Sequence, residues 1–281
     1  MKIGLATKGA SDPRLLEKIA VRADELGFDS FLVTDHFMTP VSNRNIDAWT
    51  FLPYLAAKTT RIRLGTCVTP LPFRHPAMLA KMVATADVLS GGRIILGSGL
   101  GWGRAEFEGF STWRELPDRA AMSKEALELM TRLWTSESPV DYQGRFVSVK
   151  GAVIEPKPIQ KPYPSIWFGA MAPFHLRLAS RYGQGWIPVG PRWTSAGVVP
   201  PEGYAEMKKV LSGELSRNGN RGHDFVFSIL IGHADITTLR ADFERYEKAG
   251  MNYFIVGQPR GADETFLKDL ETVSKDLASS L

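Results

Sequence analysis

Segments with the hydrophobic pattern of a buried strand alternate with segments of helical periodicity along almost the whole chain. The pattern predicts strands at residues 2–7, 30–34, 61–69, 93–102, 165–171, 185–189, 225–232 and 252–257. It predicts helices at residues 13–26, 47–58, 76–89, 118–134, 173–182, 204–215, 238–249 and 264–277. This alternation is typical of a parallel sheet covered by helices, because each crossover helix packs back onto the sheet.

Eight such units in 281 residues predict an α/β protein with a (β/α)8 (TIM) barrel that forms one domain over residues 1–281. A doubly wound sheet is the alternative, but its nucleotide fingerprint is incomplete, since Trp102 stands where the third glycine after Gly97 and Gly99 belongs. No helix is predicted directly behind these glycines. Residues 137–164 interrupt the rhythm and are predicted to be a small insertion between the fourth helix and the fifth strand, with a hairpin near 140–149.

Composition narrows the class of partner and the compartment. The net charge is +4 and the basic residues are scattered, so a nucleic-acid partner is not expected. There is no apolar run of 18 residues, so no membrane partner is expected either. The polar start lacks the pattern of a signal peptide, and Cys67 is the only cysteine. Together these features predict a cytoplasmic protein without an intramolecular disulfide.

The carboxyl ends of the predicted strands carry few reactive side chains. Asp35 and His36 follow the second strand, Cys67 lies near the end of the third, and His233 follows the seventh. Cys67 has no second cysteine and no obvious base nearby, which favours a small apolar filler over a nucleophile. Motifs of serine hydrolases, zinc proteases and redox dithiols are absent, and no metal site is predicted. Such a rim favours a reaction carried by a cofactor.

Several motifs in order make the chain similar to the bacterial luciferase-like family. They are the segments 34–37, 64–69, 74–77, 89–93, 96–102, 156–166 and 185–186. The resemblance extends over nearly the whole chain. It implies a barrel that binds FMN or the deazaflavin coenzyme F420, and the compact chain with its 34–37 segment resembles the F420-dependent branch more closely. It also implies a homodimer formed by the helices around the second to fourth strands.

The resemblance assigns roles to individual residues. A non-prolyl cis peptide, Cys67-Val68, would support the central ring of the cofactor together with Thr69. The remaining ring and phosphate contacts would come from Gly99, Leu100, Gly101, Gly169, Ala170 and Met171, the last three through backbone amides at a helix start. His36 would be the catalytic acid or base, with Asp35 either orienting it or contacting the deazaflavin.

Two positions depart from the family pattern. The phosphate loop reads Gly169-Ala170-Met171 where Gly-Gly-Ser is frequent, and Trp102 stands where the sugar-phosphate dehydrogenases carry a glutamate. Trp102 therefore indicates a more apolar pocket, to which Trp49, Phe73 and Trp113 are expected to contribute. Glu106 is a candidate for the nearby acid, but the interpretation favoured from the sequence is a solvated loop carboxylate.

These observations predict an F420-dependent oxidoreductase that transfers hydride between C5 of the deazaflavin and a small organic substrate. One alternative is an FMN-dependent monooxygenase that uses O2 and reduced flavin from a separate flavin reductase. Another is a flavin-binding barrel without turnover, against which the presence of Asp35 and His36 counts. The identity of the substrate and the direction of transfer stay open.

Overall fold

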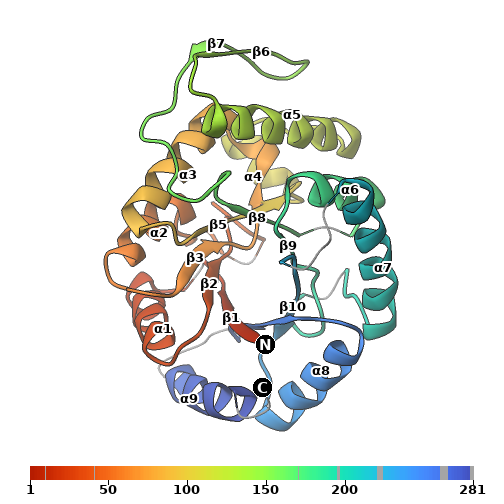
Figure 1. The fold of residues 1–281 in the computed structure, drawn as a ribbon. Helices are drawn as coiled ribbons and strands as arrows, with labels where there is room; N and C mark the ends of the chain where they lie inside the picture. Colours follow the sequence, from red (N-terminus) through yellow and green to blue (C-terminus); the bar gives the residue numbers. More distant parts are fainter. Residues whose placement is uncertain are drawn as a thin grey trace.

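Parallel strands close into a barrel that is surrounded by helices (Figure 1). The computed structural model describes residues 1–9, 11–40, 42–169, 171–194, 197–219, 224–259 and 265–278. The barrel strands are β1 (Lys2–Thr7), β2 (Ser30–Val33), β3 (Arg63–Thr66), β4 (Thr69–Pro70), β5 (Ile94–Gly99), β8 (Ser165–Phe168), β9 (Gly185–Trp186), β10 (Val226–Gly232) and β11 (Tyr253–Gly257). Their order is β3-β2-β1-β11-β10-β9-β8-β5-β4, and pairing of β3 with β5 closes the ring. Because β4 prolongs the course of β3, these segments make eight barrel positions in the described residues, and the predicted (β/α)8 barrel is confirmed.

The helices follow the predicted alternation with small shifts at their ends. They are α1 (Pro13–Glu25), α2 (Ala48–Ala56), α3 (Pro76–Ser90), α4 (Arg104–Phe110), α5 (Leu116–Thr135), α6 (Pro173–Tyr182), α7 (Pro201–Arg217), α8 (Ile236–Lys248) and α9 (Thr265–Ala278). Side chains of Asp12, Asp47 and Asp235 cap α1, α2 and α8 by accepting backbone N–H groups of the first turn. The expectation that no helix follows the glycines of β5 is wrong, since α4 begins at Arg104. Glu264, the expected start of the last helix, lies outside the described residues.

Apolar side chains fill the barrel on both faces of the sheet. The cluster inside the ring consists of Ala6, Leu32, Ile95, Trp167, Ile187, Leu230, Tyr253 and Ile255. Its two largest rings, Trp167 and Tyr253, meet edge to face with centroids 5.1 Å apart. A larger cluster lies between the sheet and the helices. Burial on both faces explains the continuous apolar runs of the strands, and a packed interior leaves the ends of the barrel for a site.

The predicted insertion contains the expected hairpin. Strands β6 (Val140–Gln143) and β7 (Ser148–Ala152) pair antiparallel as a separate two-stranded sheet. Figure 1 shows this hairpin beyond α5, outside the ring of barrel strands. The hairpin therefore adds nothing to the closed sheet.

The sequence predicts one continuous third strand over residues 61–69, but the structure shows a broken one. It divides into β3 and β4, and between them the Cys67-Val68 peptide is cis, as the family resemblance implied. The divided strand runs very close to β5, because a Cβ built on Gly97 would lie 1.9 Å from the carbonyl oxygen of Thr66. Glycine at position 97 is therefore needed for the two strands to approach.

We expect Gly97→Ala to lower the free energy of unfolding by about 3 kcal/mol or more, because the added methyl group overlaps the backbone of β3. Gly213→Ala on α7 is the matched control, since a Cβ there meets nothing within 4 Å. The control should gain about 0.5–1 kcal/mol from its higher helix propensity. Urea unfolding followed by circular dichroism measures both, and equal stability of the two variants would contradict the described packing.

Candidate functional site

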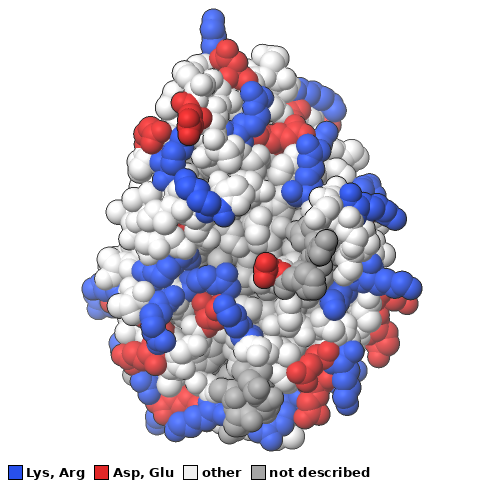
Figure 2. Space-filling model, viewed as in Figure 1, with Lys and Arg blue, Asp and Glu red and all other residues white. Residues whose placement is uncertain are grey.

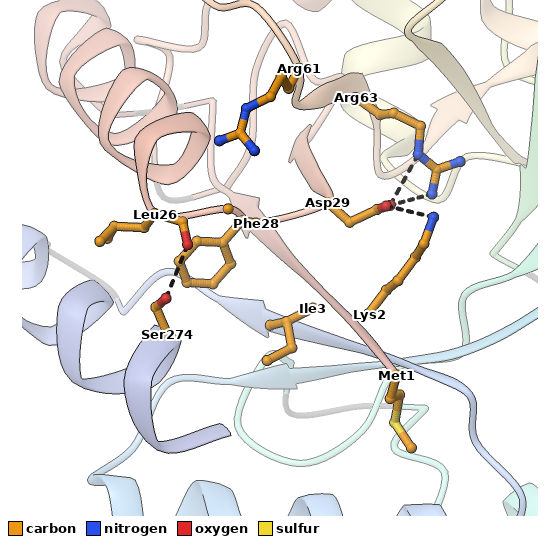
Figure 3. A pocket seen from close by; sticks show the side chains of 10 residues that line it. Met1, Lys2, Ile3, Leu26, Phe28, Asp29, Arg61, Arg63 and Ser274 are labelled. Atoms are coloured by element: carbon orange, nitrogen blue, oxygen red, sulfur yellow. Dashed lines mark hydrogen bonds and ion pairs between the residues drawn. The ribbon is translucent and has the colours of Figure 1, made fainter. Parts of the chain in front are cut away.

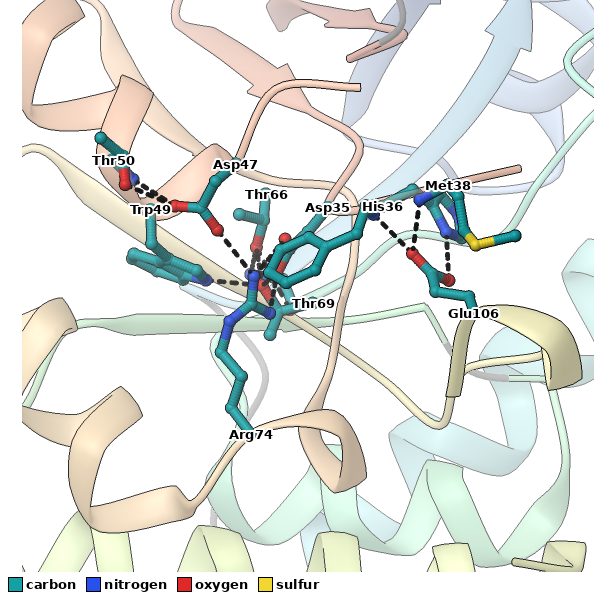
Figure 4. A network of polar contacts seen from close by, with 12 residues as sticks. Asp35, His36, Met38, Asp47, Trp49, Thr50, Thr66, Thr69, Arg74 and Glu106 are labelled. Carbon is teal, nitrogen blue, oxygen red and sulfur yellow. Dashed lines mark hydrogen bonds and ion pairs between the residues drawn. The ribbon is translucent and has the colours of Figure 1, made fainter. Parts of the chain in front are cut away.

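The carboxyl ends of β2, β3 and β5 bring together the polar residues predicted from the sequence. Asp35 and His36 follow β2, the Cys67-Val68 peptide follows β3, and Trp102 follows β5. β2 pairs with β3, and β3 pairs with β5, so the three strands are consecutive in the ring. Figure 4 shows the polar contacts that hold the side chains around this end of the barrel.

His36 is held by Glu106, a residue of α4 that the sequence reading placed in solvent. The distance from Nδ1 of His36 to Oε2 of Glu106 is 2.9 Å, and the second carboxylate oxygen accepts the backbone N–H of Phe37 at 2.5 Å. Glu106 is only 3% exposed, so the expectation of a solvated loop carboxylate is wrong. The reason is α4, whose first turn carries Glu106 back against the loop that follows β2.

The surroundings of Glu106 favour its ionised form. Burial alone would raise the pKa of Glu106, but bonding to His36 and to the backbone N–H groups of Phe37 and Met38 lowers it below its ordinary value. A carboxylate at Nδ1 favours the His36 tautomer that carries its proton there, and this leaves Nε2 as the nitrogen that can accept a proton from a bound molecule. The pair can therefore act as an oriented acid or base.

Asp35 is not the partner of His36 that the sequence reading allowed. Arg74 binds both oxygens of Asp35 at 2.7 and 2.8 Å and also reaches Asp47 at 3.0 Å (Figure 4). Thr69 donates its hydroxyl to Asp35 at 2.7 Å. Asp35 is buried, and its bonds to Thr69 and Arg74 link the end of β2 to β4 and, through Arg74 and Asp47, to the start of α2. A contact between Asp35 and a cofactor stays a prediction. The sequence analysis included Arg74 only within the family segment 74–77 and assigned it no role.

Two aromatic residues expected to line an apolar pocket have other roles. Trp49 is buried and donates its indole N–H to Thr69 at 3.0 Å, and Phe73 is buried against Phe37 and Phe107. The expectation is therefore wrong for these two, whereas Trp113 is partly exposed. Trp102 is 61% exposed, and its ring meets His36 with centroids 5.4 Å apart.

The glycines of this end of the barrel make room for Val68. A Cβ on Gly99 would lie 2.3 Å from one methyl of Val68, and a Cβ on Gly169 would lie 3.0 Å from the other. Gly101 has φ of +76° and lies against the ring of Phe107. The glycines therefore let the turn at Val68 sit close to β5, instead of forming a bare surface themselves.

The residues present fit a flat ring with a phosphate tail. Cys67 and Val68 are partly exposed and offer an apolar platform, and burial raises the pKa of the Cys67 thiol to about 12, which keeps it neutral. α6 begins without a side-chain cap, so its first amides suit an anion. Ser98 has a buried hydroxyl without a hydrogen-bond partner in the described part of the chain.

Other residues predicted for the site have no described contact with the His36–Glu106 pair. Gly169 and Leu100 are partly exposed and Met171 is exposed, whereas Ala170 lies outside the described residues. His233 pairs with Asp269 of α9 at 3.3 Å. Among the described residues, no group of three or more histidine, cysteine, aspartate or glutamate side chains could hold a metal ion.

The remaining surface offers no competing site of comparable chemistry in the described ranges. Figure 2 shows lysine and arginine interspersed with aspartate and glutamate on the face in view. A cavity of about 360 Å³ lies at the amino ends of the strands, where Lys2 and Arg63 both pair with Asp29 (Figure 3). That end of a barrel contributes to stability and not to catalysis. None of the helices in these ranges could cross a membrane.

Comparison with known proteins gives matches in sequence and in structure. A sequence model described as luciferase-like monooxygenase matches residues 1–210. The F420-dependent glucose-6-phosphate dehydrogenase of Microbacterium testaceum is 36% identical over 217 residues, which are 75% of this chain and 61% of that protein. This chain therefore spans about three fifths of the length of that curated relative.

Two solved structures share the fold at low identity. An F420-dependent secondary alcohol dehydrogenase in complex with an F420-acetone adduct superposes with a TM-score of 0.85 at 21% identity, covering 98% of this chain and 97% of the other. The F420-dependent tetrahydromethanopterin reductase of Methanopyrus kandleri gives 0.78 at 18% identity, covering 97% of each chain. These likenesses establish the barrel over the length of the chain.

We expect the free energy of unfolding to depend less on pH in the Glu106→Gln variant than in the parent. Because the pKa of Glu106 is lower in the folded chain, its carboxylate stabilises the fold above the ordinary glutamate pKa, and this contribution is lost as pH falls through the folded pKa. The difference in unfolding free energy between parent and variant should stay constant while the pH is well above the ordinary glutamate value of 4.5, and should shrink as the pH falls below that value. Glu108→Gln, at an exposed position of the same helix, is the control and should follow the parent. Parallel curves for Glu106→Gln and the parent would refute the assignment.

Proposed function

The chain belongs to the luciferase-like monooxygenase family, and within it we propose an oxidoreductase that uses coenzyme F420 to act on a small organic substrate. The observation that carries the proposal is the His36–Glu106 pair beside the Cys67-Val68 platform. The pair provides one oriented acid or base, and the platform provides a place for a flat ring. The name of the curated relative, an F420-dependent dehydrogenase, supports F420 over FMN.

Each part of the site has a task under this proposal. Cys67, Val68 and Thr69 would hold the ring on one side, with Gly99, Leu100 and Gly101 at its edge. The phosphate would lie near the start of α6, at the amide of Met171, because the Gly169 amide already donates to the Ser98 carbonyl at 3.0 Å and Ala170 lies outside the described residues. When bound, F420 supplies the donor or acceptor of hydride at its C5 atom.

Under this proposal, His36 transfers the proton that accompanies the hydride. Its Nε2 would take a proton from a substrate hydroxyl in the oxidative direction, or return it in the reductive direction. Glu106 holds the ring in place and stabilises the imidazolium that forms when Nε2 is protonated. Arg74 keeps Asp35 fixed at the end of β2, so the loop that carries His36 is anchored on both sides.

The alternative is an FMN-dependent monooxygenase, because the family bears that description and the same platform would accept an isoalloxazine ring. It would require O2 and a flavin reductase as a partner. A flavin-binding barrel without turnover is less well supported, because the buried Glu106 carboxylate bonds to His36 and to the backbone of Phe37 and Met38, which orients the histidine. We also propose a cytoplasmic location, because a single cysteine allows no intramolecular disulfide and fits a reducing compartment.

We expect F420 to bind with a Kd below about 100 μM, which corresponds to about −5.5 kcal/mol, and FMN to bind more weakly. Fluorescence titration of the purified protein with each cofactor measures this. His36→Asn should leave the F420 affinity unchanged and lower kcat about 10²–10⁴-fold with any alcohol that the parent oxidises, because it removes the proton acceptor.

Two results would count against the proposal. Tighter binding of FMN than of F420 would favour the monooxygenase. Full turnover by His36→Asn would remove the assigned role of the histidine, whatever cofactor binds. His75→Asn is the control, since the His75 side chain caps α3 by accepting the backbone N–H of Ala77 and has no role in the proposed site.

We propose a homodimer that buries the outer face of α3. Met78 and Leu89 are exposed on this helix, and they lie eleven residues apart, which returns to the same face after three turns. Exposed apolar side chains gathered on one face are typical of an interface between copies.

The double variant Met78→Lys, Leu89→Lys should sediment as a monomer at micromolar concentration while the parent sediments as a dimer, because two charges would be buried in the interface. Val210→Lys on α7 is the control for an exposed apolar position elsewhere and should remain dimeric. A monomeric parent would dismiss the proposed dimer.

A further inference from the structure

Three neighbouring strands of the barrel are each followed by large exposed apolar side chains. β5 pairs with β8, and β8 pairs with β9, so the three are consecutive in the ring. Trp102 and Phe110 follow β5, Met171 follows β8, and Val198 lies in the segment after β9. Single exposed apolar residues are common on protein surfaces, but an arc of them at the catalytic end of a barrel marks a binding surface.

The arc adjoins the histidine. Trp102 meets the ring of His36 edge-on, and Phe110 meets the ring of Phe37, the next residue, with centroids 5.2 Å apart. At the far end of the arc the methyl group of Met171 lies 3.0 Å from the Cβ position of Gly197. One part of this exposed apolar group therefore lies beside His36, and the other part follows β8 and β9, the next two strands of the ring.

Arg74, Arg104 and Arg119 are each engaged by groups of the chain itself. Arg74 binds two carboxylates, Asp35 and Asp47. Arg104 pairs with Glu108, and Arg119 donates to the backbone carbonyl groups of residues 100 and 101. An anionic substrate would have to displace these partners, whereas an uncharged one would not.

Resting on the proposed function, we infer that this site takes uncharged alcohols or carbonyl compounds with a sizeable apolar body, and that Trp102 determines this specificity. His36 would face the oxygen of such a molecule, and the indole of Trp102 would cover its apolar part. The substrate class then differs from the sugar phosphate named for the curated relative. The difference lies in binding and adds no chemical step.

The test compares acetophenone, acetone and glucose 6-phosphate as ligands of the F420-loaded protein by calorimetry. Acetophenone should bind at least tenfold more tightly than acetone, because its phenyl ring is buried against Trp102. Glucose 6-phosphate should bind more weakly than acetophenone. Trp102→Ala should remove most of the tenfold preference, Trp102→Phe should retain it, and Val210→Ala should leave it unchanged. The F420 affinity should be the same in all variants.

Each adverse result has a separate meaning. Tighter binding of glucose 6-phosphate than of acetophenone overturns the substrate class. An unchanged preference in Trp102→Ala overturns the role of Trp102, and a loss of F420 affinity in that variant assigns the residue to the cofactor instead. The three ligands are also titrated into the cofactor-free protein, where the same order is expected. A failure of F420 to bind would therefore count against the proposed function, while the ligand order still decides this inference.

Discussion

The close approach of the third and fourth barrel positions is the constraint on which the site depends. Thr66 and Val68 occupy space that a side chain on β5 would need, so glycine must stand at positions 97 and 99. This packing lets the chain turn at Val68 and still close the ring through the pairing of β3 with β5. The same turn carries the polar group of Thr69 toward Asp35. The same packing of β3 and β4 against β5 therefore closes the barrel and places Thr69 beside Asp35.

Two buried carboxylates, Asp35 and Glu106, have different roles around the loop that carries His36. Asp35 is held by Arg74 and is directed at the scaffold, whereas Glu106 is directed at the imidazole. The division is physical, because a buried carboxylate needs either a cation or several N–H donors, and each of the two has found a different solution. A single buried acid could not both brace β2 and orient His36.

Much of the fold could be predicted from the sequence, because strand and helix periodicities are local. The parallel strands and the position of the hairpin are examples, and family resemblance supplied the cis peptide at Cys67-Val68. The break in the third strand and the helix α4 could not be read from periodicity, since one is two residues long and the other has seven residues. Glu106 was recognised only as a possible acid near the site, and its pairing with His36 could not be predicted, because the two residues lie 70 positions apart. The pairing of Arg74 with Asp35 is likewise a contact between distant segments.

The short segment after β5 holds two different functions within a few residues. Trp102 stands at its start, and Glu106 lies one helical turn further on, in α4. One stretch of chain thus carries both the aromatic surface and the group that aligns the imidazole. Grafting that stretch between relatives would exchange ligand preference and proton-transfer geometry together, so evolution could not readily alter either in isolation by swapping the loop. Divergence within such barrels would then proceed by point replacement at the first of these positions while the second is retained.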